Sequence, residues 1–199
     1  MSNSYYSIVI PYLKKSKSIS KCIELLKKNS QFSFELIEII DSTDVYKAFN
    51  DGVEKSSSDI VILMNDDMFV SLGWDINFVK YTKDKNICTG YLIEPGVIPV
   101  SSKNIQIDFG SSVEEFEENS FNDWVAKNKN KFAEKIDGEK GWYMPISFDK
   151  NYWVPYPNDI KFPHPNDITL VDDILPSLNY TFSKVNSFVY HLQNYSKRI

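Results

Sequence analysis

The first 65 residues alternate between uninterrupted apolar runs and segments with helical periodicity. Apolar runs over 6–10, 36–40 and 60–64 predict three strands buried on both faces of a sheet. Between them, apolar residues recur at intervals of three and four over 19–26 and 45–52, which predicts two amphipathic helices. This strand–helix–strand–helix–strand order is typical of an α/β protein with a mostly parallel sheet. Pro11 lacks an N–H group and is expected to end the first strand.

The second half of the chain is less regular. Residues 74–81 predict a third helix and 87–93 a fourth strand, while 105–109 alternates like a strand with one exposed face and the charged segment 113–132 is predicted to be helical. The segment 138–165 holds five prolines among its tryptophans and tyrosines. We expect loops there, with neither a central strand nor a long helix.

The composition fits one globular domain. The chain has 199 residues, 42% apolar and 25% charged, without an internal repeat or a low-complexity linker. We therefore expect a single domain over 1–199. Aromatic residues make up 15%, more than a minimal core requires. Some of these rings could line a pocket, and a tyrosine-rich core is the alternative.

Charge and residue usage narrow the class of protein. The net charge of −5 argues against a nucleic-acid partner, which requires a basic face. No apolar run is long enough to span a bilayer and the start does not read as a signal peptide, so we expect a soluble, cytoplasmic protein. Cys22 and Cys88 lack metal-type spacing, and a reducing compartment suits them. Because His164 and His191 are the only histidines, any metal must rely on oxygen ligands.

Polar residues follow the ends of three predicted strands, at Pro11–Tyr12, Asp41–Asp44 and Asn65–Asp67. Ligands of open α/β sheets bind at the carboxyl ends of the strands. The first turn has neither GxGxxG nor GxxxxGK[ST], which argues against a Rossmann dinucleotide site and a P-loop. Adjacent carboxylates repel unless a cation or hydrogen bonds satisfy them, and Mg²⁺ and Mn²⁺ prefer oxygen ligands. A solvated turn is the alternative for the last of these segments.

The succession SIVIPY, ELIEIIDSTD, KAFNDGVEKSSSD and IVILMNDDM resembles the nucleotide-sugar half of the GT-A glycosyltransferases, family 2 in particular. In that family a strand ending in Pro-Tyr opens the site, and a second strand ends in an acid that contacts the base. A helix with an Ala-x-Asn-x-Gly pattern, here Ala48–Gly52, precedes the DxD metal motif, here Asn65–Asp67. The likeness covers 5–81 and is thin over 95–165.

The resemblance implies a GT-A fold, a mostly parallel central sheet flanked by helices, with 1–94 as the nucleotide-sugar-binding half and 95–199 as the acceptor half. It implies an inverting transferase that moves a hexose or related sugar from a UDP-, GDP- or TDP-linked donor to a hydroxyl of a glycan or another acceptor. It also implies a divalent cation, Mn²⁺ or Mg²⁺. The donor-binding residues it implies are Pro11, Tyr12, Asp41, Asn50, Asn65 and Asp66.

Three residues of the nucleotide-sugar-binding half bear on how the metal and the donor would be held. Asp67 is the acid that holds the metal in the family. Asn65 stands where the family usually has the first acid, and its amide can bind a hydroxyl without adding negative charge, so donor binding is expected to be weaker or differently selective. Lys47, one turn before Asn50, could approach the diphosphate, and a solvated surface lysine is the alternative.

The C-terminal part matches the same family. Family 2 enzymes carry an acid pair at the start of a helix, one member being the catalytic base, and many carry a later strand-end histidine that binds the metal. Here Asp172–Asp173 and His191, after a strand predicted over 183–190, take those places, with Ser196 nearby. Pro176 puts the helix start near 172, so Asp172 would cap the helix and Asp173 would be the base. Capping alone, and a buried histidine without metal, are the alternatives.

Two further classes of function stay open. Asn65 and the short chain are compatible with a non-catalytic nucleotide-sugar-binding module. A sugar nucleotidyltransferase would carry a glycine-rich basic loop after the first strand, and 13–17 is lysine-rich without glycine. Trp142 and Trp153 could stack on an acceptor sugar or pack in the core. His164, between prolines, is expected at the surface or on the acceptor side.

Overall fold

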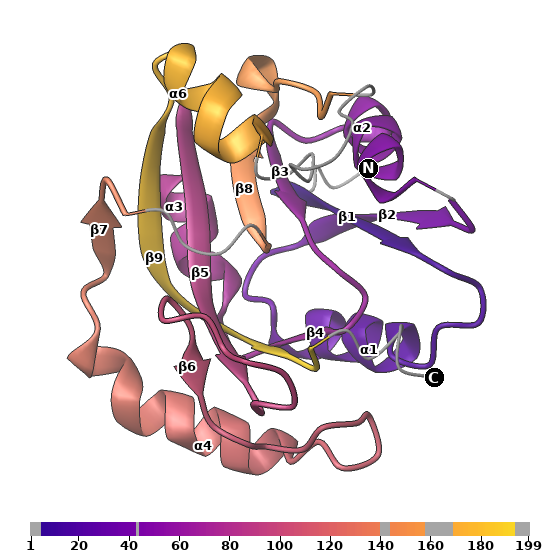
Figure 1. Ribbon diagram of the computed structural model, residues 1–199, viewed down its shortest axis with the longest axis vertical. Helices are drawn as coiled ribbons and strands as arrows, with labels where there is room; N and C mark the ends of the chain where they lie inside the picture. Colours follow the sequence, from indigo (N-terminus) through magenta and orange to yellow (C-terminus); the bar gives the residue numbers. More distant parts are fainter. Residues whose placement is uncertain (1–4, 43, 140–143, 158–168, 194–199) are drawn as a thin grey trace.

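The computed structural model describes residues 5–42, 44–139, 144–157 and 169–193 (Figure 1). The residues in these ranges form a nine-stranded sheet of order β2-β1-β3-β8-β5-β9-β4, with β6 added beside β5 and β7 beside β9. The strands are β1 (Tyr6–Tyr12), β2 (Phe34–Ile40), β3 (Ile60–Leu63), β4 (Met68–Val70), β5 (Asn86–Glu94), β6 (Ile105–Gln106), β7 (Lys135–Asp137), β8 (Ile146–Asp149) and β9 (Thr181–His191). The helices are α1 (Ile19–Asn29), α2 (Val45–Lys55), α3 (Asp75–Tyr81), α4 (Glu118–Asn128) and α6 (Leu175–Ser177), with 3₁₀ turns at Lys129–Lys131 and Lys150–Tyr152 and a π-helical turn at Thr169–Ile174.

Six strands of the sheet run in one direction. β1 is parallel to β2 and β3, and β5 is parallel to β6 and β9. Because β8 is antiparallel to both β3 and β5, these two groups of strands run in the same direction. Only β4, β7 and β8 run the other way. The prediction of a mostly parallel sheet flanked by helices is confirmed. The carboxyl ends of β1, β2, β3, β5 and β9 therefore share one edge, called here the C-terminal edge.

The two predicted helices of the first half pack as their periodicity indicates. α1 buries Cys22, Leu25 and Leu26, and α2 packs on β1 and β2. At the start of α2, Asp44 accepts hydrogen bonds from the N–H groups of Tyr46 and Lys47, which caps the helix. None of the helices in the described ranges combines the length and apolar composition that a bilayer requires.

Pro11 does not end the first strand, as its missing N–H led us to expect. β1 continues to Tyr12, whose carbonyl accepts a hydrogen bond from Asp41 N on the β2 side. Directions alternate along a strand, so the nitrogen of Pro11 points to the β3 side. Pairing with β3 has already ended at Val9. No ladder hydrogen bond is lost, and proline is tolerated there.

The segment 138–165 also differs from expectation. Residues Ile146–Asp149 form β8, a central strand between β3 and β5, with Val61 opposite Phe148 and Cys88 opposite Ser147. Pro145 lies just before the strand, so it removes no ladder donor from it. Earlier in the chain, the strand expected over 105–109 is only two residues long, and the helix expected over 113–132 is confined to α4.

The aromatic residues mainly fill the core, as the alternative interpretation of their abundance proposed. Rings make up most of the largest fully buried side chains, namely Tyr6, Phe49, Phe69, Trp74, Phe78, Phe121, Phe148, Tyr156, Phe188 and Tyr190.

Glu35 on β2 makes the stability of the sheet depend on pH. Its carboxylate accepts hydrogen bonds from Ser7 Oγ at 2.6 Å and from N and Oγ of Ser57 at 2.8 and 3.0 Å. Burial alone would raise the pKa of Glu35, but these hydrogen bonds hold it below its ordinary value. Their contribution is present above the unfolded-state pKa of about 4.3 and is lost as the pH falls through the folded-state pKa.

We therefore expect Glu35→Gln to lower the thermal unfolding midpoint at pH 7 and to differ less from wild type at pH 3 than at pH 7. Thermal unfolding of both proteins at the two pH values measures this. An equal difference at pH 3 and pH 7 would show that packing, and not the ionised carboxylate, is responsible.

Candidate functional site

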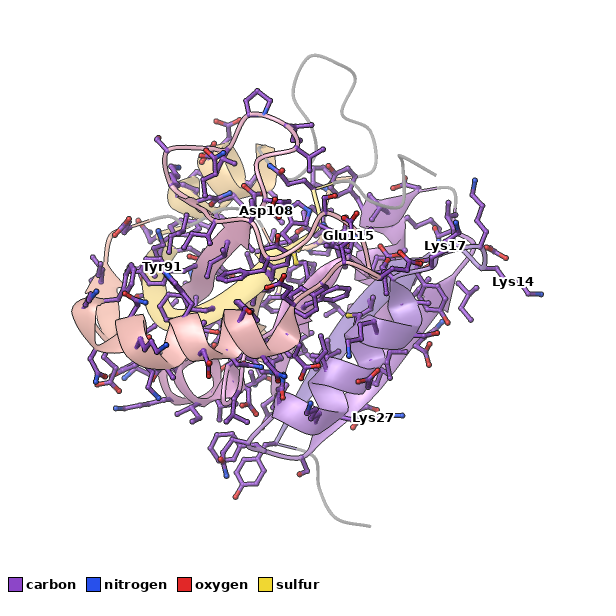
Figure 2. All side chains as sticks on the ribbon, turned by 90° about the horizontal axis from the view of Figure 1, so that it is seen from below. Lys14, Lys17, Lys27, Tyr91, Asp108 and Glu115 are labelled. Carbon is purple, nitrogen blue, oxygen red and sulfur yellow. The ribbon has the colours of Figure 1, made fainter. Side chains whose placement is uncertain are left out.

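The three strand ends that the sequence singled out are joined by hydrogen bonds. The hydroxyls of Ser16 and Ser18, before α1, both donate to Asp66 Oδ2. Lys14 N donates to Asp41 Oδ1 at 2.6 Å. The loop after β1 is thus tied to the ends of β2 and β3. In Figure 2 the exposed side chains of Lys14 and Lys17 extend from this loop away from the ribbon.

Asp67 and His191 lie side by side at the C-terminal edge. Met68 pairs with His191 between β4 and β9, and Leu192 N donates to Asp67 O at 3.0 Å. This pairing brings Asp67 Oδ1 to 3.6 Å from His191 Nε2, and the two side chains are only 7% and 13% exposed. The structure therefore brings together the two residues that the sequence analysis assigned to the metal.

Glu94, the last residue of β5, contacts the other ring nitrogen of His191. Its Oε1 lies 2.7 Å from His191 Nδ1, and its Oε2 accepts a hydrogen bond from Asn104 Nδ2 at 2.9 Å. Burial lowers the pKa of His191, but Asp67 and Glu94 outweigh burial and raise it to about 9. Glu94 is not among the residues predicted from the sequence. Its position at the end of an apolar strand was the signal that could have found it.

The donor set of this pair fits a divalent cation. Within the described residues, no group of three or more His, Cys, Asp and Glu side chains is arranged to hold a metal. Mg²⁺, however, binds through one or two carboxylates and completes its shell with waters and substrate phosphates. Protein ligands lie about 2.1 Å from such an ion, so two of them can be up to about 4.2 Å apart. The 3.6 Å between Asp67 Oδ1 and His191 Nε2 lies within that limit.

Asn50, of the Ala-x-Asn-x-Gly pattern, holds the backbone of another loop. Its Nδ2 donates to Tyr156 O and its Oδ1 accepts from Tyr156 N, both at 2.9 Å. These contacts give Asn50 a structural role, and its contact with the donor stays a prediction. Lys47 is exposed and paired with Asp51 on its own helix at 2.6 Å, as the surface alternative proposed.

The remaining donor-binding predictions lie at or near the edge. Pro11 is buried in β1, and half-buried Asn65 follows β3. The Tyr12 hydroxyl donates to Glu38 Oε2 at 2.7 Å, a hydrogen bond that raises the pKa of Tyr12 to about 12.

Trp153 packs against the core. Its ring stacks on Phe148 with centroids 4.1 Å apart and meets Tyr156 edge-on at 5.7 Å. One ring face is therefore already covered, which favours the packing alternative over a sugar platform. Trp142, His164 and Ser196 lie outside the described residues.

The acid pair Asp172–Asp173 is not brought to these residues. It lies inside the π-helical turn, so neither acid is the helix-starting cap expected from Pro176. Two residues later, Leu175 O accepts from Tyr180 N, just before β9 begins. β9 is 11 residues long, about 33 Å at about 3.3 Å per residue, and His191 is at its far end. In Figure 1, α6 and β4 correspondingly lie at opposite ends of β9.

A cavity of about 620 Å³ also lies at this opposite edge. It is lined by residues at the starts of β5 and β9 and by residues of β7, among them Lys85, Asn86 and Phe182. None of the residues assigned from the sequence lines it. The strand-end contacts, and not this cavity, define the candidate site.

Comparisons with known proteins support the fold. Neither the models of known protein families nor the sequences of characterised proteins match this chain. Among solved structures, the crystal structure of GalNAc-T7 with UDP, GalNAc and Mn²⁺ is similar, with a TM-score of 0.60 over 96% of this chain and 10% identity. This chain spans 44% of that chain's length. The chain thus has an α/β fold with a mostly parallel sheet flanked by helices, similar to the fold of a GT-A glycosyltransferase.

Proposed function

We propose that this protein is a metal-dependent glycosyltransferase that moves a sugar from a nucleoside diphosphate sugar to an acceptor hydroxyl. The observation that carries the proposal is the pair Asp67 and His191, side by side at the C-terminal edge of a GT-A sheet. The similar fold of GalNAc-T7, whose structure contains UDP, GalNAc and Mn²⁺, supports it.

Asp67 would hold the cation through its carboxylate and His191 through Nε2. When bound, a divalent cation neutralises the charge that develops on the departing diphosphate. Asp66 binds the hydroxyls of Ser16 and Ser18 and so keeps the loop after β1 beside the site. We assign Asn65 to a hydroxyl of the donor, which its amide can hydrogen-bond. Residues 1–94 would then supply most donor contacts and 95–199 the acceptor contacts, with His191 joining the donor side.

Thermal shift with UDP, GDP and TDP, each with and without Mn²⁺, tests the proposal. Because ligands that bind the folded state raise the unfolding midpoint, one nucleoside diphosphate should raise it, and only with the cation. Stabilisation by none of the three contradicts the proposal and leaves no support for a nucleotide-sugar module. Stabilisation by nucleoside triphosphates would indicate a nucleotidyltransferase instead. Such an enzyme joins a nucleoside triphosphate to a sugar phosphate and releases pyrophosphate, which can be measured.

Because Asp172 and Asp173 lie away from the proposed metal ligands, we no longer expect their variants to lose activity. A general base must lie within hydrogen-bond reach of the acceptor, and Asp173 lies at the opposite end of β9 from His191. We expect Asp172→Asn and Asp173→Asn to retain donor binding and to transfer within about twofold of wild type, because neither acid reaches the site.

The transfer rate at saturating donor, measured with an acceptor found by screening, decides this point. A loss of transfer rate on the order of 10²–10⁴-fold in Asp173→Asn, the usual contribution of a general base, would restore the assignment made from the sequence.

Inversion at the anomeric carbon, which the family resemblance implies, stays a prediction.

A further inference from the structure

The carboxylate of Glu94 is buried and shared between two partners. The side chain is only 6% exposed. One oxygen faces His191 Nδ1 at 2.7 Å, and the other accepts from Asn104 Nδ2 at 2.9 Å. The resulting chain of contacts runs Asn104–Glu94–His191–Asp67, and its last separation is the 3.6 Å between the two proposed metal ligands.

The two nitrogens of a neutral imidazole have different roles, because one carries a proton and the other a lone pair. Which nitrogen is protonated is set by the hydrogen bond that the other nitrogen makes. A carboxylate beside Nδ1 accepts a hydrogen bond from Nδ1–H, so in the neutral ring the proton stays on Nδ1 and the lone pair is on Nε2. At His191 this is the nitrogen that faces Asp67.

We infer that Glu94 is a positioning residue for the metal site: it fixes the His191 ring and holds the proton of the neutral ring on Nδ1, so that Nε2 is the nitrogen that binds the cation. The inference rests on the proposed function, because it names the support of that same site. Asn104 Nδ2 donates to the second oxygen of Glu94 and so restrains the carboxylate that faces the ring.

The loop that carries Asn104 is itself tied beside His191. Gln193 Oε1 accepts from Gly96 N at 3.1 Å and from Ile98 N at 3.3 Å, and its Nε2 donates to Ile98 O at 3.0 Å. Lys184, also on β9, donates to Lys103 O at 3.1 Å. Residues 95–104 therefore leave β5 at Glu94 and return to that residue through Asn104. Gln193, just after β9, holds the start of this loop, and Lys184 on β9 holds its end. This arrangement supports Glu94 before any ligand arrives.

The first test measures Mn²⁺ binding, with Mn²⁺ alone as the probe and its free concentration read by electron paramagnetic resonance. Glu94→Ala removes the acceptor and should weaken binding by about 10–100-fold, the usual effect of losing an outer-shell partner. Glu94→Gln keeps one acceptor oxygen and should bind with intermediate affinity. Glu54→Ala, at an exposed position on α2, loses the same charge and should match wild type. Circular dichroism and thermal unfolding show whether each variant is folded.

The second test reads the ring directly and needs no metal. The chain has only two histidines, so ¹⁵N spectra in a His164→Ala background report His191 alone. At pH 10, where the imidazole is neutral, the protein with Glu94 should show the Nδ1–H tautomer. Glu94→Ala should lose it in favour of the Nε2–H tautomer or a mixture.

The two tests separate the inference from the function on which it rests. Unchanged Mn²⁺ affinity in Glu94→Ala, or an unchanged Nδ1–H tautomer there, overturns the positioning role. If the wild-type protein does not bind Mn²⁺, the proposed metal-dependent function fails, and the ¹⁵N spectra still decide whether Glu94 orients the ring.

Discussion

Asp67→Asn should abolish the Mn²⁺-dependent binding of nucleoside diphosphates. The change replaces one of the two proposed protein ligands by a neutral amide, so the loss should exceed the roughly 10–100-fold typical of an outer-shell partner. The fold should persist, because the contact that joins this turn to the end of β9 uses the backbone carbonyl of Asp67 and the N–H of Leu192. Isothermal titration with UDP, GDP and TDP, in Mn²⁺ and in EDTA, measures the effect.

Asp123→Asn is the matched control. Asp123 is exposed on α4, and the substitution changes the net charge by the same amount. Its metal-dependent binding should equal that of wild type. Undiminished metal-dependent binding in Asp67→Asn would show that other groups hold the cation and would remove the central observation of the proposed function.

Gly52→Ala should destabilise the protein, although alanine is normally the better helix residue by about 0.8–1.0 kcal/mol. Gly52 is buried where α2 crosses β1, and a Cβ built there would lie 2.2 Å from Val9 Cγ1. Val9 is fully buried, and its β-branched side chain has few alternative rotamers. Such overpacking typically costs about 1–3 kcal/mol, which exceeds the gain in helix propensity. The urea unfolding midpoint measures the difference.

A double-mutant cycle isolates this contact. Val9→Ala removes the two methyl groups that a new Cβ would meet, so Gly52→Ala should cost less in that background than in wild type. Equal costs in both backgrounds would place the strain elsewhere, and a higher midpoint for Gly52→Ala in wild type would contradict the prediction outright. The result bears on the site, because α2 also carries Asn50, which holds the Tyr156 backbone.

The regular first half of the fold could be predicted because its signals are local. Uninterrupted apolar runs and helical spacing lie within each segment, so β1, α1, β2, α2 and β3 follow from the sequence alone. β4, β7 and β8 could not be found in this way, since none of them lies in an apolar run as long as 60–64, and three or four residues show too little alternation to be distinguished from a loop. The central place of β8 depends on pairing with β3 and β5, which come from distant parts of the chain.

The sequence by itself determined which side chains stand at strand ends, and with the family resemblance it singled out Asp67 and His191. Only the tertiary structure decided which strand ends meet. The pairing of β4 with β9 puts His191 beside Asp67, and the pairing of β5 with β9 adds Glu94. The same topology leaves Asp172 and Asp173 at the far end of β9. The physical reason is that periodicity records the environment of a single segment, whereas contacts between segments depend on non-local strand pairing, which no local pattern encodes.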